Sequence, residues 1–172
     1  MKIPLEEFSI KKCLPIHLDE ILEIQNKALS RLPAMDILRK NTVQMLSDCL
    51  NPPHITLGAW HDNILTAFSV LYFPEDSEEN LARQLVSIDT FGLKTANNKL
   101  CIVREDFRGN SLQYNLGLIL ERYAVEANVK MLCSTVSPKN PYSIRNLTLL
   151  GFIYNRTLTK YGVERNLYYK FI

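Results

Sequence analysis

The sequence lacks the features that mark several large classes of protein. It has no apolar run long enough to span a bilayer, and residues 1–8 lack the long apolar core of a signal peptide. Its net charge is only +2, so no polyanion such as DNA or RNA is indicated as a partner. It contains neither Gly-x-Gly-x-x-Gly nor Gly-Lys-Ser/Thr, which argues against a dinucleotide fold and a P-loop. We therefore expect no membrane and no nucleic-acid partner.

Cysteine and histidine are also scarce, and their spacing does not suggest a metal site. The four cysteines, Cys13, Cys49, Cys101 and Cys133, form no Cys-x-x-Cys pair, and no histidine lies close enough in sequence to complete a zinc site. We expect reduced, mostly buried thiols, a cytoplasmic location and no metal.

What the sequence does contain is the composition of an ordinary globular protein. Its 172 residues are 47% apolar and 22% charged, which predicts one domain spanning residues 1–172. The apolar periodicity predicts helices at residues 18–32, 42–50, 80–88, 111–128 and 140–150. It predicts strands at residues 8–13, 55–60, 64–73, 100–103, 131–136, 152–159 and 166–172. This order predicts a mixed sheet of about seven strands flanked by helices, in the α/β or α+β class, with residues 74–98 as an irregular insert.

The most informative segment runs from Ile102 to Gln113. An apolar strand leads into a charged turn, then into Arg108-Gly109-Asn110, and then into a long amphipathic helix. Backbone N–H groups at a helix N-terminus converge on one point and carry partial positive charge, so this layout suits a pyrophosphate. Taken alone, the same turn is also a good helix start without a ligand.

A second segment follows about thirty residues later and supports the first. Asn140-Pro141 starts a short helix that ends at Gly151, with Asn as the N-cap and Pro at the first helical position. Asn-Pro alone indicates only a helix start. The order and spacing of the two segments between strands favour a joint binding site.

These two segments and the order of elements resemble the GNAT superfamily of acetyl-CoA-dependent N-acetyltransferases. The resemblance covers nearly the whole chain and is most specific from Leu100 to Phe152. It implies acetyl-CoA as co-substrate, a small-molecule or peptide amine as acceptor, and acetyl transfer as the activity. A homodimer is compatible with these features.

The resemblance also implies which residues hold the cofactor. Cys101, Ile102 and Val103 would lie along the pantetheine arm as if it were an added strand. The pyrophosphate loop would comprise Arg108, Gly109, Asn110, Ser111, Leu112 and Gln113, with Ser111 and Gln113 where the family pattern usually has small residues. Asn140 would bond the pantetheine arm, and Ser143 lies on the same helical face.

Catalysis is where the sequence departs from the family pattern. In many members a Tyr seven residues after the Asn protonates the leaving thiolate, and here that position is Leu147. Tyr161 is a candidate donor in the last hairpin and Asp89 a candidate base before the central strand.

The acidic run 75–79 reads as a solvated loop, or as a surface that attracts a cationic acceptor. A non-catalytic CoA-binding module or an interaction domain are the alternatives to a transferase.

Overall fold

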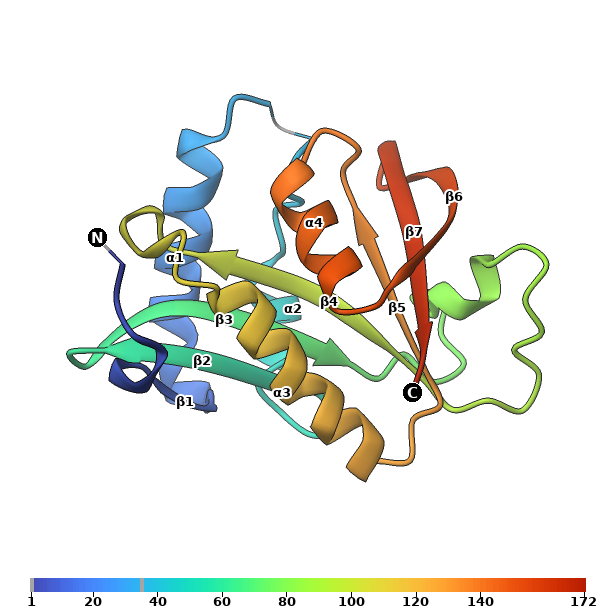
Figure 1. The fold of residues 1–172 in the computed structure, drawn as a ribbon, viewed down its shortest axis with the longest axis horizontal. Helices are drawn as coiled ribbons and strands as arrows, with labels where there is room; N and C mark the ends of the chain where they lie inside the picture. Colours follow the sequence, from blue (N-terminus) through green and yellow to red (C-terminus); the bar gives the residue numbers. More distant parts are fainter. Residues whose placement is uncertain (1, 35) are drawn as a thin grey trace.

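The computed structural model describes residues 2–34 and 36–172, and its centre is a seven-stranded sheet in the order β1-β2-β3-β4-β5-β7-β6 (Figure 1). The strands are β1 (Ser9–Lys12), β2 (Ile55–His61), β3 (Ile64–Tyr72), β4 (Thr95–Val103), β5 (Met131–Val136), β6 (Ile153–Lys160) and β7 (Val163–Phe171). The α-helices are α1 (Leu18–Arg31), α2 (Val43–Asp48), α3 (Leu112–Glu126) and α4 (Pro141–Leu149). Short 3-10 helices lie at Leu5–Glu7, Pro15–His17, Leu81–Gln84 and Glu105–Phe107. The predicted mixed sheet flanked by helices is confirmed. None of the helices in the described ranges has the length and apolarity needed to cross a membrane.

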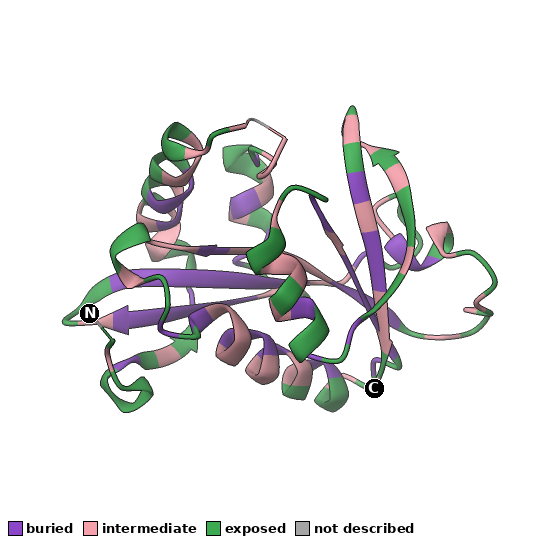
Figure 2. Ribbon diagram, turned by 45° about the horizontal axis from the view of Figure 1, so that its top comes forward, coloured by how far each residue is buried: buried purple, intermediate pink, exposed green. Residues whose placement is uncertain are grey.

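The helices cover both faces of the sheet. α3 and α4 lie on one face, and α1 and α2 lie on the other (Figure 1). Leu116 and Leu120 of α3 are buried in one core with Leu132 of β5, whereas Ile24 of α1 shares a second core with Phe68 of β3. The central strands are therefore buried on both faces, and the edge strand β6 is largely exposed (Figure 2).

The strands β4 and β5 separate from each other in the middle of the sheet. They are parallel neighbours, but only residues 95–97 of β4 pair with residues 131–133 of β5. Beyond that point Ser134 Oγ donates to the carbonyl of Asn98 at 2.8 Å, and the strands diverge (Figure 1). A bulge lies at the same place, because Leu100 pairs with Val70 and Asn98 with Leu71, which leaves Lys99 without a partner. The sheet is thus opened at its centre.

Two of the sequence predictions need correction. The central strand begins at Thr95, not at residue 100, because its polar first half is held between β3 and β5 by backbone pairing that does not depend on side-chain polarity. The helix predicted at residues 80–88 is only a 3-10 turn, Leu81–Gln84, which Asn80 caps through its side chain. The insert is therefore shorter than predicted.

One buried pair of side chains holds the end of the loop between α1 and α2 against α1. Gln25 of α1 is 1% exposed, and Asn41 at the end of the loop is 5% exposed. The Gln25 Oε1 accepts from both the backbone N–H and the side-chain amide of Asn41, and the Gln25 Nε2 donates to the Asn41 carbonyl at 3.0 Å. This pair fixes the position of residues 36–41.

We expect Gln25→Ala to lower the free energy of unfolding by about 2–4 kcal/mol, because it leaves the buried backbone N–H and carbonyl of Asn41 unpaired and leaves the Asn41 Nδ2 with the Arg39 carbonyl alone. Asn26→Ala, on the exposed side of the same helix, is the control and should change stability by less than about 0.5 kcal/mol. Urea denaturation of both variants measures the difference, and equal stabilities would show that the loop is held by other contacts.

Candidate active site

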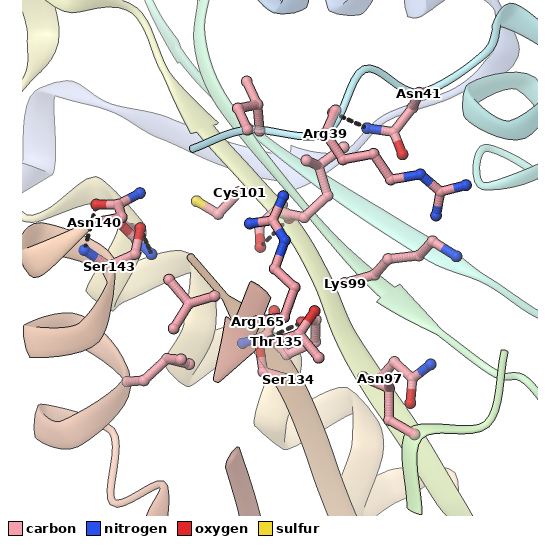
Figure 3. A pocket seen from close by; sticks show the side chains of 18 of the residues that line it. Arg39, Asn41, Asn97, Lys99, Cys101, Ser134, Thr135, Asn140, Ser143 and Arg165 are labelled. Atoms are coloured by element: carbon pink, nitrogen blue, oxygen red, sulfur yellow. Dashed lines mark hydrogen bonds between the residues drawn. The ribbon is translucent and has the colours of Figure 1, made fainter. Parts of the chain in front are cut away.

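The opening between β4 and β5 continues into a cleft with a volume of about 120 Å³. Figure 3 shows side chains from several elements pointing into it, with Asn140 and Ser143 to one side, Lys99 and Asn97 to the other and Arg165 between them. The cleft is thus built from segments that are far apart in the sequence.

The floor of the cleft is the free edge of β4. From residue 98 to residue 103, this strand has β3 on one side and no strand on the other. Backbone groups along such an edge are available to an extended ligand, which adds to the sheet like a further strand. Cys101 lies on this stretch and lines the cleft.

The loop after β4 presents a row of unpaired backbone donors. Within the described residues, the N–H groups of residues 109–114 donate to no protein acceptor, and the first helical bond of α3 runs from Asn115 N to the Ser111 carbonyl. Gly109 has a φ of +86°, and a Cβ built there would meet nothing within 4 Å. Ser111 has a φ of 56°, a left-handed conformation that glycine tolerates best, and its side chain makes no capping bond. This geometry suits a pyrophosphate.

Two polar side chains hold this loop in place. Asn110 is 6% exposed, accepts from the Ile3 N–H at 2.8 Å and donates to the Phe107 carbonyl at 3.0 Å. Arg104 donates to the Leu65 carbonyl at 2.6 Å and pairs with Glu23 of α1. The Asn110 side chain therefore has a structural role, and Arg108, which is exposed, remains available to a ligand.

Helix α4 forms the first wall of the cleft. The Asn140 Oδ1 accepts from the Ser143 N–H at 3.1 Å, so Asn140 caps the helix and keeps its Nδ2 for a ligand. The Gln113 Nε2 donates to Ser143 Oγ at 3.3 Å and joins α3 to α4. Leu147 faces the cleft from the next turn and is 5% exposed. Offsets of three and seven residues place these positions on one face, as the sequence predicts.

The side of the cleft away from α4, here called the second wall, carries the charged side chains. The Glu79 carboxylate is 3.0 Å from Lys99 Nζ and accepts from the Tyr161 hydroxyl at 3.1 Å. Burial alone would raise the pKa of Glu79, but the bond and charge of Lys99 hold it below its usual value. Burial and then the Glu79 charge raise the pKa of Tyr161 to about 12. Glu79 is therefore an ionised base and Tyr161 a protonated donor to it.

The cysteines take no part as nucleophiles. Burial raises the pKa of the Cys101 thiol to about 12, and it does the same for Cys13 and Cys133, while that of Cys49 rises to about 11. All four are free thiols, and only Cys101 among them lines the cleft. None of the four cysteines therefore offers the activated thiolate that a covalent acyl-cysteine intermediate requires.

The structure brings some of the residues that the sequence predicts together in the cleft. Five of them line it: Cys101, Gln113, Asn140, Ser143 and Tyr161, with Leu147 beside them. Ile102 packs into the core beneath α1, and Leu112 is buried in the core beneath α3, so both contribute backbone groups only. Asp89 is exposed in the insert, where its carboxylate accepts from the Phe91 N–H, and it does not line the cleft.

Four charged residues that line the cleft are not among the predicted site residues: Arg39, Glu79, Lys99 and Arg165. Glu79 lies at the end of the acidic run, and Arg165 lies four residues after Tyr161, but neither position alone predicts a place in the cleft. These residues come together only when the chain has folded into the complete sheet.

No protein-family model matches this chain, and no curated protein sequence is similar to it. Solved structures are similar in fold. The ribosomal-protein-alanine N-acetyltransferase of Brucella melitensis has a TM-score of 0.73 at 18% identity and covers 95% of this chain and 99% of its own. Arabidopsis thaliana NAA60, solved with acetyl-CoA, has a TM-score of 0.73 at 15% identity over 96% of this chain and 98% of its own. A Streptococcus pneumoniae acetyltransferase of the GNAT family has a TM-score of 0.71 at 14% identity over 96% and 99%. This chain has the fold of these acetyltransferases.

We expect Ser111→Gly to raise the free energy of unfolding by about 1 kcal/mol, because glycine removes the strain of a left-handed residue with a Cβ. Ser30→Gly in α1 is the matched control and should lower it by about 0.5 kcal/mol, because glycine is a poorer helix former than serine. Thermal or urea unfolding tests both signs. A loss of stability in Ser111→Gly would show that the loop does not adopt this conformation in solution.

Proposed function

We propose, from the fold shared with GNAT acetyltransferases, that this chain transfers an acetyl group from acetyl-CoA to a primary amine. The observation that carries this proposal is the pairing of an open β4 edge with a row of free N–H groups at the start of α3. The two features lie at successive points of one continuous segment, residues 98–114, as a long ligand with a phosphate end requires.

The residues present fit the cofactor in type and in order. The N–H groups of residues 109–114 and the exposed Arg108 would hold the pyrophosphate. The backbone of residues 101–103 and the Asn140 Nδ2 would hold the pantetheine arm. Acetyl-CoA supplies an activated acetyl thioester when bound.

The second wall supplies the base that the acceptor needs. An amine attacks only as the free base, so its ammonium must first give up a proton. Glu79 is ionised and faces the cleft, and it accepts that proton directly or through water. The amine nitrogen then bonds to the acetyl carbon and gives up a second proton as the carbon–sulfur bond breaks. The departing sulfur takes up one proton, so the products are an amide and a free thiol.

The residues of the cleft include no good proton donor for the departing sulfur. Leu147 has no proton to give, and Tyr161, with a pKa of about 12, is a poorer acid than an ordinary tyrosine and is engaged with Glu79. Water entering through the open mouth of the cleft is the donor that remains. We therefore infer slow turnover.

Leu147 also favours a second candidate function, a CoA-binding module without catalysis. Calorimetry with CoA and a thiol-release assay over a panel of amines separate the two. Binding with turnover supports the transferase, and binding alone supports the module. Absence of binding at millimolar CoA would contradict both.

We expect Asn140→Asp to weaken CoA binding by about tenfold, because aspartate keeps the helix cap but loses the amide donor. Asn26→Asp adds the same charge on the exposed face of α1 and serves as the control. Calorimetry measures both affinities, and thermal unfolding checks that the cap is kept. Equal affinity in parent and Asn140→Asp would leave Asn140 as a cap only.

We expect Leu147→Tyr to raise the single-turnover rate of acetyl transfer by roughly a hundredfold, because it places a general acid on the wall that faces the cofactor. CoA affinity should change little if the ring fits the space that leucine fills. Rapid-quench kinetics at several pH values measure the rate. Fast turnover by the parent, with Tyr161→Phe much slower and Leu147→Tyr no faster, would instead place the proton donor in the last hairpin.

A further inference from the structure

Arg165 of β7 is a buried cation with too few partners. Its residue exposure is 6%, and its guanidinium reaches into the middle of the cleft (Figure 3). One nitrogen, Nη1, donates to the Ile37 carbonyl at 3.3 Å, while the buried Nε has no acceptor among the described residues. The charge of Asp36 acts on Arg165, but no ion pair joins the two side chains. A buried charge without an ion pair is unfavourable, so an anion in the cleft would stabilise it.

Arg39 presents a second guanidinium to the same cleft. It stacks on the Tyr161 ring at 3.5 Å, and its buried Nη1 also has no acceptor among the described residues. Asn41, two residues after Arg39, is tied to α1 through Gln25, and its side-chain amide donates to the Arg39 carbonyl at 3.2 Å. Stacking leaves the edge of the guanidinium, where its donors lie, free to bind.

The nearby carboxylates each have a lysine partner. Asp36 Oδ2 pairs with Lys139 at 2.7 Å, and Glu79 pairs with Lys99 at 3.0 Å. The buried Asp36 Oδ1 has no hydrogen-bond partner among the described residues, and the Asp36 charge acts on Arg165 without an ion pair between them. In the described chain neither Arg39 nor Arg165 forms an ion pair with a carboxylate. The charged lining of the cleft therefore comprises three cations and one anion, Glu79.

From this arrangement we infer that the acceptor is a small amine that also carries a carboxylate, such as a free amino acid, and that Arg165 and Arg39 bind that carboxylate. The inference rests on the proposed function for the amine, but the carboxylate site stands on its own contacts. A planar carboxylate matches the fork of a guanidinium, with two parallel N–H···O bonds. Because Glu79 also lines the cleft, a singly charged group fits better than a doubly charged phosphate.

The site also selects against polyamines and other multiply cationic acceptors. Such molecules would bring further positive charge beside two unpaired guanidinium groups, and like charges in a partly buried cleft repel strongly. Glu79 is already paired with Lys99, so its single negative charge can offset one ammonium group of the acceptor but not several.

The test compares each of the common amino acids with its own carboxamide, which keeps size and amine but loses the charge. Thiol release at saturating acetyl-CoA gives kcat/KM for both, and calorimetry with the same compounds measures binding without turnover. We expect at least one amino acid to exceed its carboxamide by roughly tenfold or more in both measurements, the gain expected for a charged hydrogen-bonded pair.

Arg165→Met is the decisive variant, because methionine is similar in length and has no charge. We expect it to remove the preference for the carboxylate by raising KM, with CoA affinity unchanged and thermal stability equal or higher, since an unpaired buried charge is lost. Arg39→Met should act in the same direction and serves if Arg165→Met does not fold. Arg122→Met removes an exposed arginine from α3 and should leave the preference intact.

The outcomes separate this inference from the proposed function. Turnover of simple amines with no preference for carboxylates would overturn the inference and leave the transferase. Amino acids that bind and depend on Arg165, with no CoA binding, would support the inference and overturn the proposed function. A preference for aminoalkylphosphonates, or a loss of CoA affinity in Arg165→Met, would assign the guanidinium groups to phosphate and overturn the inference.

Discussion

The separation of β4 from β5 is the constraint on which the other features of the cleft depend. Parallel strands normally stay paired to their ends, because an unpaired edge inside a protein leaves backbone groups unsatisfied. Here pairing stops after Asn97, and Ser134 takes one of the released carbonyls, that of Asn98. The remaining edge is left to whatever fills the cleft. The opening is thus set by the backbone, so we expect substitution of side chains along β4 to leave it open.

The alternation of side chains along a strand explains why the two walls differ. Cys101 points to the face covered by α3 and α4, whereas Leu100 and the bulged Lys99 point to the other face. The first wall therefore offers backbone amides, a carboxamide and a hydroxyl, which suit a long polar cofactor. The second wall offers carboxylate, ammonium and guanidinium groups, which suit a small charged acceptor. Because of the bulge, β4 contributes to both walls. The bulged residue, Lys99, reaches Glu79, and the side chains after it still alternate between the two faces of the sheet.

Local patterns predicted the four α-helices, and long-range contacts account for the elements that they did not predict. The apolar stripe of α3 and the Asn-Pro cap of α4 are determined within one or two turns, so the sequence alone reveals them. The stretch Thr95–Asn98 reads as polar loop, and it becomes a strand only because β3 and β5 lie on either side. Arg39 and Arg165 are 126 positions apart (165 − 39) in the sequence and share a cleft only after β7 joins the sheet. Charged residues of an acceptor site have no periodicity to mark them, so no window of sequence identifies Glu79 as different from its acidic neighbours.

The protonation states of the cleft determine which kind of acetyl transfer its residues can support. With the Cys101 thiol held protonated by burial, transfer through a covalent enzyme intermediate has no nucleophile, and the amine must attack the thioester directly. Direct attack needs a base on the acceptor side, and Glu79 stays ionised there only because Lys99 and Tyr161 offset the cost of its burial. Burial and then the Glu79 charge raise the pKa of Tyr161 to about 12, so the hydroxyl that helps to keep Glu79 charged is a poor acid for the leaving thiolate. With leucine at position 147, the proposed transfer therefore has no side-chain acid for the leaving thiolate, and we expect the departure of the thiol to limit its rate.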